Sequence, residues 1–315
     1  MKKLNIISPI FNEESNLNKF YESLIIIKEK IKNNFEIKLI FVDDGSHDKS
    51  AEIIRDLSKK DEDLKGIYFT KNFGHQAAIF AGLKEFDADY YAVLDADLQH
   101  NPELIEMMLD NLIKNKCEII QMKKDNSNYE SMIKRTVSKY FYLIFSKITN
   151  INIDPGSSDF FLITNNVRDA MIKSKISHNF IRGFLHWTGF KKMSINFSPE
   201  KRSKGKSSYS YIKLLELALT GFYFYTTKLF IYIFIFAIVI LFVCIIFSIY
   251  IFYLYFIGEL ADNAGWSTIT ILVLFFGSIS LLLNSVLLFI LTKIFDYSSK
   301  KPNYIKKFTY KDEKN

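Results

Sequence analysis

Apolar and polar positions alternate in blocks over the first hundred residues, and these blocks predict alternating strands and helices. Short, almost continuously apolar runs are typical of buried strands and cover Leu4–Ile10, Ile37–Val42, Leu64–Phe69 and Tyr90–Leu94. Apolar residues recur at helical spacing in the intervening segments, which predicts helices over Glu13–Lys32, Ser46–Lys60 and Gly74–Phe86. Buried strands alternating with helices indicate a mostly parallel sheet covered on both faces, which is a Rossmann-like α/β fold.

Two long apolar stretches near the C-terminus change this picture. No charged residue lies between Lys228 and Glu259, or from Asn263 to Thr292. Each stretch exceeds the roughly 20 residues that a helix needs to cross a bilayer. One such stretch could be the core helix of a soluble protein, but two in succession predict a transmembrane hairpin. The amphipathic segment Ser207–Thr226 leads into the first stretch and is expected to lie at the membrane interface.

The distribution of charge predicts how this hairpin is oriented. The short connector carries only Glu259 and Asp262, whereas lysines and arginines precede the first stretch and follow the second. By the positive-inside rule, both termini are expected in the cytosol, at the inner membrane. No signal peptide is expected at the N-terminus. The predicted parts are an α/β domain (1–206), a juxtamembrane helix (207–227), two spans (228–257 and 268–293) with an extracytoplasmic loop between them (258–267), and a basic cytosolic tail (294–315).

Composition makes several other classes of protein less favoured. The net charge is +7, with basic residues concentrated near the apolar stretches, so lipid headgroups and phosphate ligands are more natural partners than nucleic acid. Cys117 and Cys244 are the only cysteines, and they form neither a disulfide framework nor a metal-binding pattern.

Polar residues follow three of the predicted strands, at Pro9–Glu13, Asp43–Ser46 and Asp95–Gln99. The carboxyl ends of parallel strands share one edge of a sheet, so these loops are expected to converge on one ligand crevice. The first loop lacks the glycine pattern of dinucleotide-binding proteins. Asp95 and Asp97 are separated by one small residue, and two such carboxylates can bind a divalent cation together with a diphosphate. On its own this pair could equally be a solvated turn.

These segments, in this order, resemble glycosyltransferase family 2, whose members have the GT-A fold. Lys71–Ala78 and Asp95–Gln99 narrow the resemblance to polyprenyl-phosphate glycosyltransferases, a group that includes dolichyl-phosphate mannose synthases and bactoprenol glucosyltransferases. The resemblance implies Mg²⁺ or Mn²⁺ as cofactor, with Asp95, Asp97 and Gln99 as ligands, and Asp97 counted among the catalytic residues. It also implies a nucleotide-sugar site made of Pro9, Phe11, Glu13, Asp43, Asp44, Asp95, Ala96, Arg202 and Lys206.

Further implied roles concern the acceptor. A phosphate monoester is already ionised near neutral pH, so the protein must position two anions, which requires cationic donors. The candidates for binding the acceptor phosphate are Lys123, Lys134, Arg135 and Ser138, which could instead form a solvated helix face. Asp159 matches the acid of a family motif in which Phe161 replaces the usual arginine. Asp159 is expected to orient a substrate or to act as a base.

The expected reaction is inverting, metal-dependent transfer of a sugar to a polyprenyl phosphate. By analogy, UDP-glucose and undecaprenyl phosphate are the expected substrates, and a homo-oligomer, a tetramer in related enzymes, is the expected assembly. Two alternatives remain open: a processive polysaccharide synthase of the same fold, and a non-catalytic membrane scaffold.

Overall fold

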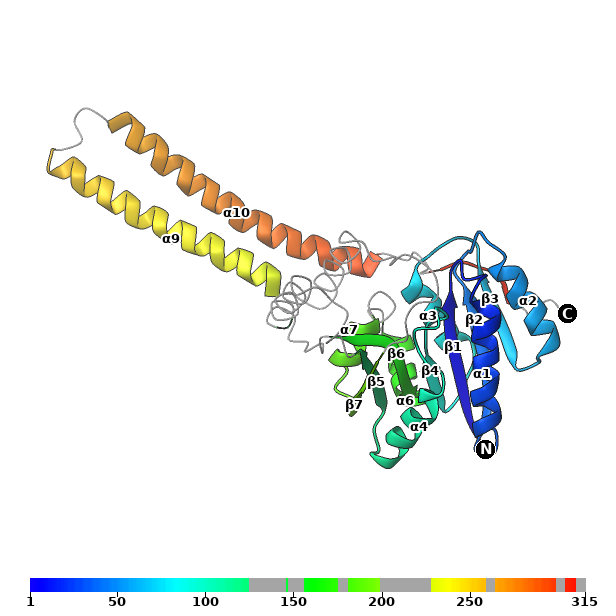
Figure 1. Ribbon diagram of the computed structural model, residues 1–315. Coiled ribbons are helices and arrows are strands. Elements are labelled where there is room, and N and C mark those ends of the chain that lie inside the picture. The colour runs from blue at the N-terminus through cyan, green and yellow to red at the C-terminus, as the bar shows by residue number, and fades with distance from the viewer. Residues whose placement is uncertain are drawn as a thin grey trace. The chain divides into compact units, whose positions relative to one another are not determined.

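A computed structural model describes residues 1–124, 146, 156–174, 181–198, 228–258, 264–298 and 304–309. In these residues the centre is an eight-stranded sheet of order β7-β5-β6-β4-β1-β2-β3-β8 (Figure 1). Its strands are β1 (Lys2–Ile10), β2 (Phe35–Asp43), β3 (Leu64–Phe69), β4 (Tyr90–Val93), β5 (Ile119–Lys124), β6 (Ser157–Thr164), β7 (Lys192–Phe197) and β8 (Lys306–Thr309).

The sheet is parallel in its centre and mixed toward its edges. Strands β4, β1, β2 and β3 are parallel neighbours, as the alternation of strands and helices predicts. Strand β6 runs antiparallel to both β4 and β5, and β8 runs antiparallel to β3. The four strands that the sequence did not predict are β5 to β8, and every antiparallel pair contains at least one of them.

Helices cover both faces of the sheet. They are α1 (Leu17–Ile31), α2 (Ser50–Lys60), α3 (His75–Glu85), α4 (Leu104–Lys114), α6 (Asn165–Lys173) and α7 (Ile181–Trp187). Helices α1, α2 and α4 pack with Leu4, Ile6 and Phe41 in one buried core. Helix α3 packs on β1 and β2, where Gly82 lies so close to Ile7 that a Cβ atom would not fit.

Two helices begin later than the sequence predicts. The first begins at Leu17 and not at Glu13, and the second begins at Ser50 and not at Ser46. In both cases the residues before the helix bind a neighbouring loop. Asn12 has a left-handed backbone (φ 56°) and its N–H donates to Ser46 Oγ at 3.0 Å. Polar side chains that compete for backbone groups delay a helix in this way.

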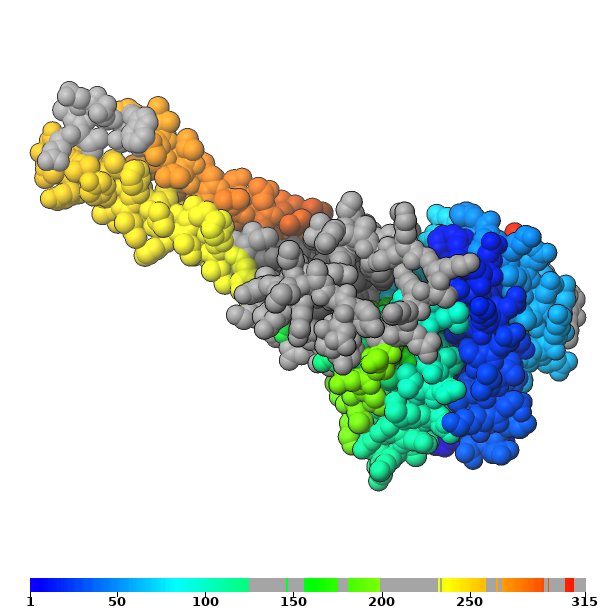
Figure 2. Space-filling view, viewed as in Figure 1, coloured from blue at the N-terminus to red at the C-terminus, as the bar shows by residue number. Residues whose placement is uncertain are grey.

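The chain divides into two compact units, one of which is Tyr225–Lys301. This unit contains α9 (Lys228–Phe256) and α10 (Ala264–Ser298), which lie side by side (Figure 2). Segments Phe234–Phe256 and Thr268–Leu291 are long and apolar enough to cross a membrane. Small residues are buried along the two helices, namely Ala237, Cys244, Ser278 and Ser285, whereas large apolar side chains point outward. Close contact through small residues is typical of helix pairs in membranes.

The other unit combines Met1–Phe224 with Pro302–Asn315. The link is β8, which extends the sheet beyond β3. Phe308 stacks on Tyr68 with ring centroids 4.5 Å apart, and Tyr304 stacks on Phe69 at 5.0 Å. No strand is predicted here from the sequence, because four residues with two lysines carry little strand signal. Lysines on a short edge strand also protect it from pairing with other chains.

Candidate active site

The loops that follow β1 and β2 are joined by hydrogen bonds between them. The His47 N–H donates to Asn12 Oδ1 at 2.9 Å, and the Glu13 N–H donates to Ser50 Oγ at 2.9 Å. Pro9 lies near the end of β1, and Phe11, which follows the strand, is 42% exposed, with its ring plane at 74° to that of His47. An exposed aromatic ring at this edge of the sheet offers a surface on which a nucleotide base can stack.

Asp44 binds the loop that follows β3. Its carboxylate accepts the N–H groups of Phe73 at 2.6 Å and Gly74 at 2.9 Å. Gly74 has φ 101° and Gly45 has φ 67°, with the Lys71 backbone too close to Gly45 to admit a Cβ atom. Glycine is therefore required at both turns. Burial raises the pKa of Asp44 to about 6, although these two N–H groups favour the ionised form.

Asp43 is buried beside Asp44. Its Oδ1 accepts the Ser46 N–H at 3.3 Å, and burial raises its pKa above the usual range. The two neighbouring carboxyls thus lie where the loop after β2 begins, next to the loop that follows β3. This arrangement suits recognition of a nucleoside by hydrogen bonds.

The loop after β4 carries the predicted metal ligands. Leu98 has a left-handed backbone (φ 60°), and the Gln99 N–H turns back to Asp97 Oδ1 at 3.1 Å. Asp95 Oδ1 is buried and accepts no hydrogen bond, although buried carboxylate oxygens are nearly always paired. Lys124 Nζ donates to Gln99 Oε1 at 3.3 Å. Ala96 is buried between the two aspartates.

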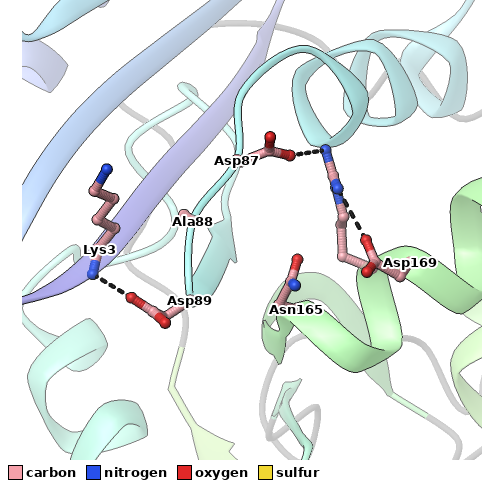
Figure 3. A pocket seen from close by; sticks show the side chains of 7 residues that line it. Lys3, Asp87, Ala88, Asp89, Asn165 and Asp169 are labelled. Carbon is pink, nitrogen blue, oxygen red and sulfur yellow. Dashed lines mark hydrogen bonds and ion pairs between the residues drawn. The ribbon is translucent and has the colours of Figure 1, made fainter.

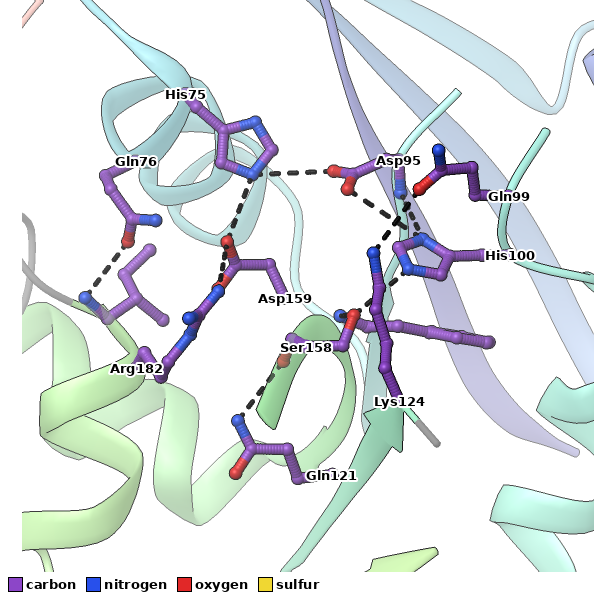
Figure 4. A network of polar contacts seen from close by, with 12 residues as sticks. His75, Gln76, Asp95, Gln99, His100, Gln121, Lys124, Ser158, Asp159 and Arg182 are labelled. Carbon is purple, nitrogen blue, oxygen red and sulfur yellow. Dashed lines mark hydrogen bonds and ion pairs between the residues drawn. The ribbon is translucent and has the colours of Figure 1, made fainter. Parts of the chain in front are cut away.

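Asp159 lies in β6, and His75 lies between it and Asp95 of this loop. His75 Nε2 lies 3.4 Å from Asp95 Oδ1 and 3.7 Å from Asp159 Oδ2 (Figure 4). Arg182 from α7 forms an ion pair with Asp159 at 3.0 Å. Burial by itself would raise the pKa of Asp159, but the charges of Arg182 and His75 outweigh it and lower that pKa. Asp159 is therefore an ionised carboxylate at neutral pH.

Neither Arg182 nor His75 is among the site residues predicted from the sequence. Arg182 follows Asp159 by more than twenty residues and belongs to no motif, so nothing in the sequence pairs the two. His75 lies within the Lys71–Ala78 motif, which was the available signal. Its position at the start of α3 aims it at both carboxylates.

Several predicted site residues lie elsewhere. Lys134, Arg135, Ser138, Arg202 and Lys206 fall outside the described residues. Lys123 is half-buried in β5, where it pairs with Ser157. Among the described side chains, no three His, Cys, Asp or Glu residues converge as a ready metal-ligand cluster. The fit to a cation therefore depends on Asp95, Asp97 and the amide oxygen of Gln99.

An open hollow of about 520 Å³ lies at the opposite end of the strands (Figure 3). Its polar groups are largely bound to one another. Arg168 donates to the carbonyls of Leu83 and Lys84 and forms ion pairs with Asp87 and Asp169. These contacts tie α6 to the end of α3, which is a structural role.

Comparison with known proteins supplies the family. Residues 5–173 match glycosyl transferase family 2. An uncharacterised glycosyltransferase of Bacillus subtilis, YkcC, is 31% identical over 306 residues, which cover 97% of this chain and 94% of that protein. A prophage bactoprenol glucosyl transferase homolog of Escherichia coli is 29% identical over 219 residues, covering 70% and 71%. Glucosyl-3-phosphoglycerate synthase from Mycobacterium tuberculosis, solved with Mn²⁺, UDP and phosphoglyceric acid, aligns with 14% identity and a TM-score of 0.49, covering 69% and 75%.

Proposed function

Because the chain belongs to glycosyl transferase family 2, we propose that it transfers a sugar from a nucleotide-sugar to a polyprenyl phosphate at a membrane surface. Membership in this family makes the chain a glycosyltransferase with a GT-A fold. The donor proposed is UDP-glucose and the acceptor undecaprenyl phosphate. Support for the acceptor comes from relatives named bactoprenol glucosyl transferase, together with two helices long and apolar enough to span a membrane.

The observation that carries the proposal is the convergence of the Asp95 and Asp159 carboxylates, which we assign to the donor and the acceptor. Asp95 follows β4, Asp159 lies in β6, and both face His75 Nε2 within 3.7 Å. Asp44 and Phe11 lie at the same edge of the sheet, on the loops after β2 and β1. A nucleoside held at Asp44 and Phe11 would extend its diphosphate toward Asp95, as ligands do beyond the carboxyl ends of parallel strands.

The residues after β4 fit a hard divalent cation, Mg²⁺ or Mn²⁺. Asp95 Oδ1 is a buried oxygen that accepts no hydrogen bond, although His75 Nε2 lies 3.4 Å away, and Asp97 and Gln99 would add two further oxygen ligands in the same loop. Mg²⁺ is usually bound by one or two carboxylates together with substrate phosphates. When bound, the ion would neutralise charge that develops on the departing diphosphate.

The transfer step needs positioning more than proton removal. An ionised phosphate oxygen of the acceptor attacks the anomeric carbon, the bond from that carbon to the nucleoside diphosphate breaks, and the configuration inverts. No proton has to be removed, because a phosphate monoester is already largely ionised at neutral pH. Asp159 has a lowered pKa and is paired with Arg182, so we assign it an orienting role. Lys123, Lys134, Arg135 and Ser138 remain the candidates for the acceptor phosphate, and Arg202 and Lys206 for the diphosphate.

The membrane arrangement is part of the proposal. Residues 1–206 would form the cytosolic catalytic domain and 207–227 a juxtamembrane helix. The spans 228–257 and 268–293 would be joined outside by 258–267, and 294–315 would return to the cytosol. The chain would assemble as a homo-oligomer, with a tetramer as the proposed state.

Transfer by the purified protein in lipid vesicles tests this function. Vesicles with undecaprenyl phosphate receive radiolabelled UDP-glucose, UDP-GlcNAc, UDP-galactose or GDP-mannose, with Mg²⁺, Mn²⁺ or a chelator. We expect one sugar per lipid, only with metal, and best with UDP-glucose. Radiolabel that enters a water-soluble polymer would instead indicate a processive synthase. No transfer from any donor would refute the proposed reaction.

A further inference from the structure

The ladder between β4 and β6 ends just before the two facing carboxylates. Its antiparallel register runs from Tyr90 opposite Thr164 to Val93 opposite Phe161. Two more residues in this register would place Asp95 directly opposite Asp159. Directly opposed residues in such a ladder lie about 4.5–5.5 Å apart at Cα, and like charges there repel. A closed ladder would therefore force the two carboxylates together and leave no space for a substrate.

His100 occupies the place where the ladder opens. It follows the metal-ligand loop, and only 2% of it is exposed. Its ring lies between Phe160, with centroids 5.1 Å apart, and Phe197, at 5.5 Å. Its Nδ1 lies 3.4 Å from the Asp95 backbone nitrogen, and its Nε2 lies 3.0 Å from Ser158 Oγ (Figure 4). One side chain thus bonds Asp95, two residues after β4, to the residue beside Asp159.

The direction of these bonds follows from the backbone. His100 Nδ1 lies 3.4 Å from the Asp95 nitrogen and 3.8 Å from Asp95 Oδ2. Because the nearer Asp95 N–H can only donate, we assign Nδ1 of the neutral ring as its acceptor and place the ring proton on Nε2. Nε2–H then donates to Ser158 Oγ, which also accepts the Phe160 N–H at 3.2 Å. In a continued ladder the Asp95 N–H would donate to a β6 carbonyl. Here His100 provides the acceptor, so a ring separates the strands.

The β6 side of this bridge is itself held in place. The Ser158 carbonyl accepts Gln121 Nε2–H at 3.2 Å, and Gln121 Oε1 lies 2.8 Å from His186 Nε2. Strand β6 therefore remains bound to β5 where it leaves β4, with Lys123 still opposite Ser157. The position of β6 is thus fixed on both sides, by His100 toward β4 and by Gln121 toward β5. The gap between β4 and β6 is therefore a defined separation.

We propose that His100 is a positioning residue that holds β4 and β6 apart and sets the spacing of Asp95 and Asp159 around the reacting centre. The proposal rests on the proposed function, in which these carboxylates face the donor and the acceptor. A misplacement of about 1 Å costs roughly a hundredfold in rate when reacting groups must be aligned. The consequence is a role in turnover that is separable from donor binding.

Three substitutions test this role. His100→Phe keeps a ring between Phe160 and Phe197 but removes both hydrogen bonds of the bridge. Ser158→Ala removes only the hydrogen-bond partner in β6. His100→Gln restores a donor and an acceptor at position 100. We expect His100→Phe to lower kcat for lipid glycosylation about thirtyfold or more, with the donor KM changed less than about threefold. The kcat of Ser158→Ala should also fall, and the kcat of His100→Gln should be about tenfold higher than that of His100→Phe.

The double variant distinguishes one bridge from two independent effects. If His100 and Ser158 act through the same bond, His100→Phe with Ser158→Ala should be no slower than His100→Phe alone. Three results would each overturn the proposal. The losses of kcat in the two single variants could multiply in the double variant, the kcat of His100→Phe could stay within threefold of the unmodified protein, or the donor KM could rise as much as kcat falls. If His100→Phe does not fold, as judged by its melting temperature, Ser158→Ala and His100→Gln decide by the same criteria.

Failure of the proposed function would have a different signature. An unmodified protein that glycosylates no polyprenyl phosphate would refute the acceptor. The spacing of the carboxylates would then be tested by the rate at which the same variants hydrolyse UDP-glucose to UDP and glucose. Equal hydrolysis rates in all of them would overturn the positioning role of His100.

Discussion

Donor binding should weaken in mild acid because of Asp44. Burial raises the pKa of this carboxyl to about 6, and it is the ionised form that accepts the N–H groups of Phe73 and Gly74. At pH 5 about one-tenth of such a group is ionised, whereas at pH 8 nearly all of it is. If only the ionised pocket binds, affinity for the donor should fall about tenfold from pH 8 to pH 5, with a midpoint near pH 6.

Folding stability should change in the opposite direction over the same range. The pKa of Asp44 is higher in the folded protein than in the unfolded chain, so protonation favours the folded state. This stabilisation is fully present below the unfolded value, near pH 4, and is lost as the pH rises through about 6. A rise from 3.8 to about 6 corresponds to ~3 kcal/mol at most. Water that enters the pocket screens the charge and reduces this figure.

The assay is calorimetric titration of UDP-glucose at fixed metal concentration, together with chemical unfolding, each from pH 4.5 to pH 8. UDP-glucose is preferred to UDP, whose terminal phosphate itself titrates near pH 6. Asp44→Asn should remove both dependences. Asp43→Asn is the matched control and should retain them with a lower midpoint, because the charge of Asp43 contributes to the raised pKa of Asp44. A binding midpoint that stays near pH 6 in Asp44→Asn would refute the reasoning.

Three further predictions concern the metal loop, the acceptor site and the C-terminal strand. Asp97→Ala should reduce metal-dependent transfer about a hundredfold or more. Its binding of UDP-glucose in the presence of a chelator should stay unchanged. Full transfer by this variant would show that Asp97 is not a metal ligand. Lys134→Ala combined with Arg135→Ala should raise the KM for the lipid more than that for the donor, and equal increases would indicate a general defect. Phe308→Ala removes the ring stacked on Tyr68 and should cost about 1–2 kcal/mol, lowering the melting temperature by about 2–8 °C; an unchanged melting temperature would mean that β8 does not stabilise the sheet.

The parallel centre of the fold was predictable because its strands are buried on both faces. Leu64–Phe69 is continuously apolar apart from Lys65 and Gly66, and the structure confirms the strand with these bounds. Strand β8 was not predictable, because its pairing partner β3 lies more than 230 residues away in the sequence. An edge strand of four residues is defined by its partner and hardly at all by its own pattern.

The residues of the candidate site that belong to loop motifs directly after strands could be predicted from the sequence. Asp44 and Asp95 come directly after strands, and parallel strands bring such residues to one edge of the sheet. The side chains that hold the site came from elsewhere: Arg182 lies on a separate helix, and His100 looks like an ordinary loop residue in the sequence. Their roles depend on the antiparallel pairing of β4 with β6, which no local pattern encodes.

The split of the catalytic unit into Met1–Phe224 and Pro302–Asn315 constrains both synthesis and topology. Strand β8 reaches its partner β3 only after α9 and α10 have been made, so the sheet stays one strand short while the hairpin is synthesised. Hydrogen-bonded strands of one sheet cannot lie on opposite sides of a bilayer. In the membrane arrangement proposed above, the chain must therefore cross the bilayer an even number of times between Phe224 and Pro302. Completion of the sheet would thereby act as a check that both helices have been inserted.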